Sequence, residues 1–120
     1  MKIFIAGNVP SSKNSKRWTG KMLINSKTVM KYIKDTKSQY ECYRSDFKEM
    51  VAGKKFPVTV SFKFTRGSKH KFDYINPAQT VQDLMVKNNW IEDDNCDYII
   101  PCFEVYEYDK ENPGVEIKIL

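Results

Sequence analysis

Acidic and amide side chains gather at both ends of one segment, residues 72–97. Asp73 and Asn76 open this segment, Asp83 lies within it, and it closes on four acids, which are Glu92, Asp93, Asp94 and Asp97. Hard cations such as Mg²⁺ bind carboxylate oxygens, commonly one or two of them together with water. The segment therefore indicates a divalent metal site. The alternative is that Asp73 and Asn76 cap a helix and the acidic residues form a solvated loop.

The charge of the chain is divided between its two halves. The net charge is +5, from 20 lysines and arginines against 15 acids. Residues 13–37 carry cations against the single acid Asp35, whereas the acids dominate from Glu92 onward. A basic half and an acidic half in a small protein fit a nuclease, because cations hold phosphates and carboxylates hold a metal ion.

Composition excludes several classes of protein. The 120 residues suit one domain, and no apolar run approaches the roughly 20 residues that a membrane-spanning helix needs. No signal peptide is visible, so we expect a cytoplasmic protein with no membrane partner. The three cysteines, Cys42, Cys96 and Cys102, lack zinc-site spacing and indicate reduced thiols. His70 is the one histidine, which excludes a histidine-rich zinc centre.

Hydrophobic periodicity predicts a single α/β (α+β) domain over residues 1–120, with a mixed sheet packed against one long and one shorter helix. The long helix begins at the N-cap Ser26 and ends at Gly53; the shorter one begins at the N-cap Asn76, with Pro77 next, and fades near Asn89. The predicted strands cover residues 2–6, 21–25, 56–65, 98–108 (an edge or bulged strand, because Pro101 interrupts its apolar residues) and 115–120.

Two basic segments are candidates for binding a phosphate backbone. Residues 7–19 form a predicted loop that mixes glycine, serine and cations, and its binding residues are Lys13, Asn14, Lys16 and Arg17. Trp18 either stacks on an unpaired base or anchors this loop to the core. A basic turn over residues 66–71 adds Arg66, Lys69 and Lys71. The lysines along the long helix either form a solvated face or extend this phosphate-binding surface.

Two stretches resemble the RusA family of Holliday-junction resolvases. The first strand followed by GNVPSSKNSKRW is similar to the start of that family. The central segment is similar to the family signature, an Asp-x-Asp-Asn-x-x-Lys motif followed by an Asp-Leu step and an Asp-Asp pair. The matching residues are Asp73, Asn76, Asp83, Leu84, Asp93 and Asp94. The tail DKENPGVEIKIL corresponds to the family's closing strand, so the resemblance covers nearly the whole chain.

This resemblance implies a RusA-like fold and a metal-dependent, structure-specific endodeoxyribonuclease. Its substrate would be branched DNA, a four-way junction above all, in recombination and repair, and its cofactor Mg²⁺ or Mn²⁺. Symmetric resolution takes two cuts and implies a homodimer. A phage or prophage origin and a bacterial cytoplasm follow from the same resemblance. Asp73 and Asp94 would be catalytic, with Asp93 as a further metal ligand. The supporting residues would be Asn76, Gln79, Asp83 and Asp97.

Two positions depart from the family pattern where its chemistry is concentrated. Ile75 replaces the second aspartate of the signature, and Gln79 replaces its lysine. Either Asp93, Asp97 or Glu92 compensates for the missing ligand, or metal affinity and cleavage rate are reduced. Two other functions therefore stay open: a RusA-like protein that binds DNA with impaired cleavage, and a phage accessory module that binds another protein.

Overall fold

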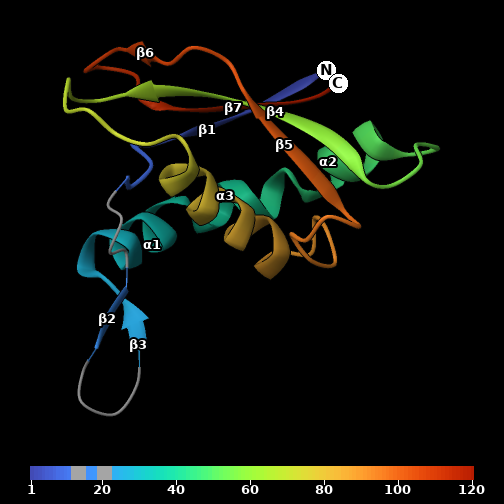
Figure 1. The fold of residues 1–120 in the computed structure, drawn as a ribbon, viewed down its shortest axis with the longest axis horizontal. Coiled ribbons are helices and arrows are strands. Elements are labelled where there is room, and N and C mark those ends of the chain that lie inside the picture. The colour runs from blue at the N-terminus through green and yellow to red at the C-terminus, as the bar shows by residue number, and fades with distance from the viewer. Residues whose placement is uncertain (12–15, 19–22) are drawn as a thin grey trace.

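The computed structural model describes residues 1–11, 16–18 and 23–120 (Figure 1). In chain order its elements are β1 (Lys2–Ala6), β2 (Lys16–Trp18), β3 (Leu23–Asn25), α1 (Lys27–Cys42), α2 (Arg44–Val51), β4 (Val58–Arg66), α3 (Ile75–Lys87), β5 (Ile99–Phe103), β6 (Glu107–Tyr108) and β7 (Gly114–Ile119). They form one α/β domain, as predicted, with three helices in place of the two expected. None of the described helices has the length and hydropathy that crossing a bilayer requires.

The main sheet has five strands. Its strands pair in both directions, so the prediction of a mixed sheet is confirmed. The strand order is β1-β7-β4-β5, and the short β6 also pairs with β4. The β1–β7 and β7–β4 pairs are antiparallel, whereas β4 pairs with β5 and β6 in parallel. The predicted edge strand is confirmed in β5. Pro101 pairs in register with Val60, and the strand continues to Phe103. The predicted segment 98–108 is divided, because residues 104–106 separate β5 from β6, which pairs with the same strand β4. An edge strand accommodates proline since only one side of it is paired.

The two faces of the sheet differ in polarity. Figure 1 shows α1, α2 and α3 on the same side of the sheet. The fully buried side chains of β1 and β7 that contribute to the core between these layers are Ile3, Ile5, Val115 and Ile117. The alternate residues of the same strands carry exposed ion pairs, such as Lys2 with Glu116 at 3.6 Å. This alternation is typical of a sheet with one solvated face.

The long predicted helix is two helices. The N-cap prediction is confirmed, because the Ser26 hydroxyl accepts a hydrogen bond from the Val29 N–H at 3.3 Å. A single helix as far as Gly53 is wrong, since the chain leaves helical geometry at Tyr43 (φ −85°, ψ 1°). The hydrogen bonds continue through this residue, which donates to Gln39 and accepts from Phe47 at 3.0 Å each. Phe47 of α2 lies in the core, where it is fully buried.

The helix α3 begins two residues earlier than predicted. Its N-cap is Tyr74, so Asn76 as the N-cap is wrong. Asn76 instead lies in the first turn, where its N–H donates to the Asp73 carbonyl at 3.0 Å. Pro77 follows in the same turn, where its missing N–H costs no intrahelical hydrogen bond. The helix ends at Lys87, and Asn89 adopts a positive φ of 61°, which confirms the predicted end near this residue.

The segment predicted as a loop over residues 7–19 includes a strand. Lys16–Trp18 form β2, which pairs with β3 in a separate antiparallel sheet, so the loop prediction is wrong for these three residues. The predicted strand over residues 21–25 is confirmed at Leu23–Asn25. Lys13 and Asn14 lie outside the described residues. Figure 1 shows β2 and β3 extending away from the main sheet, beyond α1.

Candidate functional site

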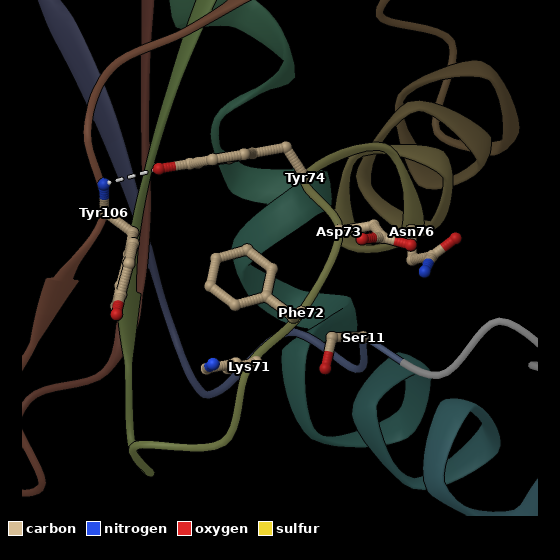
Figure 2. Close-up of a pocket in the computed structure, with 7 residues that line it drawn as sticks. All are labelled: Ser11, Lys71, Phe72, Asp73, Tyr74, Asn76 and Tyr106. Carbon is tan, nitrogen blue, oxygen red and sulfur yellow. Dashed lines mark hydrogen bonds between the residues drawn. The ribbon is translucent and has the colours of Figure 1, made fainter.

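An open cavity of about 460 Å³ lies beside the start of α3 (Figure 2). Its described lining residues come from the loop after β1, the segment that leads into α3 and the loop between β5 and β6: Ser11, Lys71, Phe72, Asp73, Tyr74, Asn76 and Tyr106. The structure therefore brings two sequence-predicted site residues, Asp73 and Asn76, to one cavity. A lysine, Lys71, lines the same cavity.

An aromatic wall, made by Phe72, Tyr74 and Tyr106, bounds this cavity on one side. The Tyr74 hydroxyl accepts a hydrogen bond from the Tyr106 N–H at 3.0 Å, and the Phe72 ring packs edge-on against both tyrosines, 5.2 and 5.1 Å between centroids. Figure 2 shows Asp73 and Asn76 on the other side of Phe72 from Tyr106. Sequence analysis missed these aromatic residues, although the placement of Phe72 and Tyr74 on either side of Asp73 was a usable signal.

A polar face of α3 continues from this cavity toward the acidic turn, which is the segment that carries Glu92, Asp93, Asp94 and Asp97. Asn76, Gln79 and Asp83 are spaced three and four residues apart, which places them on one side of a helix. The Gln79 amide donates hydrogen bonds to Asp83 Oδ1 at 2.9 Å and to Asp94 Oδ2 at 3.4 Å. Asp94 therefore reaches the middle of α3. Gln79, Asp83 and Asp94, all sequence-predicted, meet at this point.

Buried apolar residues hold the acidic turn in place. Trp90 and Ile91, which directly precede the acids, are almost fully buried. The Trp90 indole donates to the Tyr40 carbonyl at 2.7 Å and stacks on Phe47 at 5.2 Å. The left-handed conformation of Asn89 turns the chain back from the end of α3. These contacts with α1 and α2 fix where Asp93 and Asp94 emerge.

Burial and a neighbouring acid both disfavour the charge of Asp94. Partial burial, the charge of Asp83 and a hydrogen bond with Asp93 raise the pKa of the Asp94 carboxyl above its ordinary value. The Asp94 N–H donates to Asp93 Oδ1 at 2.8 Å. Within the rest of the turn, the Asp97 N–H donates to Asn95 Oδ1 at 2.9 Å. The carboxylate of Glu92 accepts from the Tyr98 hydroxyl at 2.7 Å.

The carboxylate oxygens at this site meet the ligand requirements of a hard cation only in part. Carboxylate oxygens from Asp83, Asp93 and Asp94 are the type of ligand that Mg²⁺ and Mn²⁺ bind. Among the residues that the structure describes, no three His, Cys, Asp or Glu side chains form a group that could hold a metal ion. Mg²⁺ is commonly held by one or two carboxylates plus water, so Asp94 with one neighbour fits such a partial site. The assignment of Asp73, Asp93 and Asp94 as a joint ligand set stays a prediction.

The predicted DNA-binding cations lie in three different environments. Arg66 is buried at the end of β4, with a side chain 5% exposed. Lys69 is exposed and packs over the Tyr108 ring at 5.1 Å, and Lys71 is exposed at the cavity beside Asp73. Lys16, Arg17 and Trp18 are placed by the backbone of β2 alone.

The two residues that depart from the family pattern lie on the same side of α3. Ile75 and Gln79 are one turn apart, both are exposed, and Ile75 is 70% exposed. An exposed isoleucine contributes little to the core, so an aspartate at this position would be compatible with the fold. No family model matches this chain, and no curated protein matches it either. The relation to RusA therefore stays a prediction from the motif register.

Proposed function

We propose that this chain is a RusA-like, metal-dependent endodeoxyribonuclease that cuts branched DNA. One observation carries the proposal. Gln79, on the face of α3 that begins at Asn76, donates hydrogen bonds to both Asp83 and Asp94. Three positions of the signature (Gln79, Asp83 and Asp94) thus share one surface although the chain separates them by up to 15 residues. An acidic loop surrounded only by solvent would not make this contact between Asp94 and α3.

The residues of the site would have different roles in cleavage. Asp94, together with Asp83 or Asp93, would hold Mg²⁺ or Mn²⁺, and the bound ion would lower the pKa of a water molecule and offset charge on the phosphate. Gln79 holds the Asp83 and Asp94 side chains near each other. Asp73 and Asn76 would orient the scissile strand in their cavity, and Lys71 would bind a neighbouring phosphate. A two-fold homodimer would present two such sites to a four-way junction.

A second function, DNA binding with impaired cleavage, is favoured by a specific feature of the same face. The exposed aliphatic side chain of Ile75 supplies no metal ligand where the RusA signature has a carboxylate. The neutral amide of Gln79 likewise supplies no positive charge to the phosphate. The basic surface and the fold would be retained in such a protein.

The experiment is a cleavage assay on an end-labelled four-way junction, with Mg²⁺ and Mn²⁺ tested separately. An active resolvase produces paired symmetric nicks that Asp94→Asn removes. Asp35→Asn is the matched control, because Asp35 is exposed on α1 and pairs only with Lys31 among the described residues. Salt-sensitive junction binding without nicks would support the binding function instead. The absence of both binding and nicking would overturn both functions.

A further inference from the structure

A second cavity lies next to the Asp73 cavity and has a different chemical character. Its volume is about 520 Å³, and we call it the Arg66 cavity. Its described lining residues are mainly cations, hydroxyls and an amide: Asn8, Pro10, Ser11, Ser26, Thr28, Arg66, Ser68, His70 and Lys71. No carboxylate is among these described lining residues. Such a lining offers hydrogen-bond donors and positive charge, which is what an anion requires.

The central feature of the Arg66 cavity is a buried cation. The Arg66 guanidinium donates to the Val9 carbonyl and, at 3.0 Å, to Ser11 Oγ. Among the described residues its Nε has no hydrogen-bond partner, and it is shielded from solvent. In the described part of the chain no carboxylate pairs with Arg66, and burial lowers its pKa from the ordinary value. A buried cation without an acid is unfavourable, so an incoming anion would stabilise this arrangement.

The start of α1 adds to the positive character of the cavity. Ser26, the N-cap of this 16-residue helix, and Thr28, in its first turn, both line the cavity. The N-terminal end of a helix carries partial positive charge and unsatisfied N–H groups that favour phosphate. The guanidinium and the helix end thus supply positive charge from two separate elements.

The two cavities share a wall. Ser11 and Lys71 line both the Arg66 cavity and the Asp73 cavity. The Phe72 ring, part of the aromatic wall, also lies under the Arg66 guanidinium at 4.8 Å. The two cavities are therefore adjacent.

We propose that the Arg66 cavity binds a phosphate group of the DNA strand that also occupies the Asp73 cavity. This inference deepens the proposed function and rests on it for the identity of the molecule that carries the phosphate. Among the lining residues, His70 and Lys71 are exposed and Ser68 is half-buried, and these three would contact the phosphate. The buried Arg66 guanidinium supplies positive charge, and its hydrogen bond to Ser11 Oγ holds that side chain in position.

The first test measures binding of inorganic phosphate to the full chain by two-dimensional NMR, with chloride at equal ionic strength as the reference. The expected result is a saturable shift of amide signals from residues around the cavity. Lys71→Met should weaken phosphate binding about tenfold, because one charge-assisted hydrogen bond is lost. The matched control is Lys54→Met. This exposed lysine precedes the nine-residue β4, roughly 25 Å from Arg66, and its change should leave binding unaltered.

The second test separates this inference from the proposed function. Inorganic phosphate should compete with a four-way junction for the wild-type chain, and Lys71→Met should lose most of that competition. Oligonucleotides with a 5′-phosphate or a 5′-hydroxyl distinguish a terminal phosphate from an internal one. Junction binding without any saturable phosphate binding would overturn the phosphate site alone. Equal weakening by Lys71→Met and Lys54→Met would also overturn it. Phosphate binding that does not compete with the junction would overturn the shared strand path.

Discussion

The acidic turn and the Arg66 cavity each concentrate charge of one sign, yet the fold depends on these charges in opposite ways. Contacts of Trp90 hold the acidic turn, and partial burial together with the nearby charge of Asp83 raises the pKa of the Asp94 carboxyl. In the Arg66 cavity the charged group itself is the anchor. Arg66 binds the Val9 carbonyl and Ser11, and so ties the loop after β1 to the end of β4.

This difference has a direct consequence for mutagenesis. Removing the charge of Asp94 should leave the fold intact or make it more stable, because this carboxylate is partly buried and lies near the charge of Asp83. Removing the Arg66 guanidinium should destabilise the fold, because the buried Val9 carbonyl loses its donor. A bound cation in the first region and a bound anion in the second would each reduce an unfavourable electrostatic energy of the free protein.

The largest expected effect is that of Trp90→Ala. Truncating this fully buried side chain removes its stacking on Phe47 and its hydrogen bond to Tyr40. The free energy of unfolding should fall by about 3–5 kcal/mol, measured by urea denaturation. Trp90→Phe keeps most of the apolar volume and should cost clearly less. A loss below about 1 kcal/mol for the alanine variant would mean that apolar contacts do not hold the acidic turn.

The next effect is that of Arg66→Met. The aliphatic replacement preserves much of the buried volume but leaves the Val9 carbonyl without its donor. The free energy of unfolding should fall by about 1–3 kcal/mol. Lys54→Met, the same charge change at an exposed site, should stay within about 0.5 kcal/mol of the wild type. Equal stability of the two variants would contradict the structural role of Arg66.

The smallest effect has the opposite sign and belongs to Asp94→Asn. Because the folded-state pKa of Asp94 is raised, the stability associated with its protonated form is present at low pH and is lost as pH rises through that pKa. Near neutral pH the asparagine variant should therefore be slightly more stable than the wild type, by at most about 0.5 kcal/mol in this partly solvated turn. Denaturation at several pH values checks this, and a variant less stable than the wild type at neutral pH would reverse the argument.

Local signals in the sequence were sufficient for most of the elements. The hydroxyl of Ser26 and the alternation of β1, β4 and β7 predict where these elements lie. The bend at Tyr43 was not predictable, because the apolar spacing continues across it from α1 to α2. The N-cap of α3 was misplaced since Asn76 and Pro77 together are also compatible with a first turn.

The candidate site was predicted less completely than the elements. The register of the family signature named both Gln79 and Asp94 as site residues, but the hydrogen bond between them was not predicted. Charge patterning placed Arg66 on a basic surface, whereas the structure buries it. Its acceptor, Val9, lies 57 residues away in the chain, and such a pairing has no signal in local sequence.

The central claim is that DNA is cut at the face of α3 that Asp94 contacts, and the most direct test introduces the two residues that the RusA signature has at positions 75 and 79. The double variant Ile75→Asp with Gln79→Lys changes two exposed side chains, so the fold should be retained. The nicking rate of a labelled four-way junction in Mg²⁺ should rise at least about tenfold over the wild type, since a metal ligand and a cation are added. Adding Asp94→Asn to the double variant should abolish this gain. A folded double variant that binds the junction and cuts no faster than the wild type, or that keeps its gain without Asp94, would contradict the account.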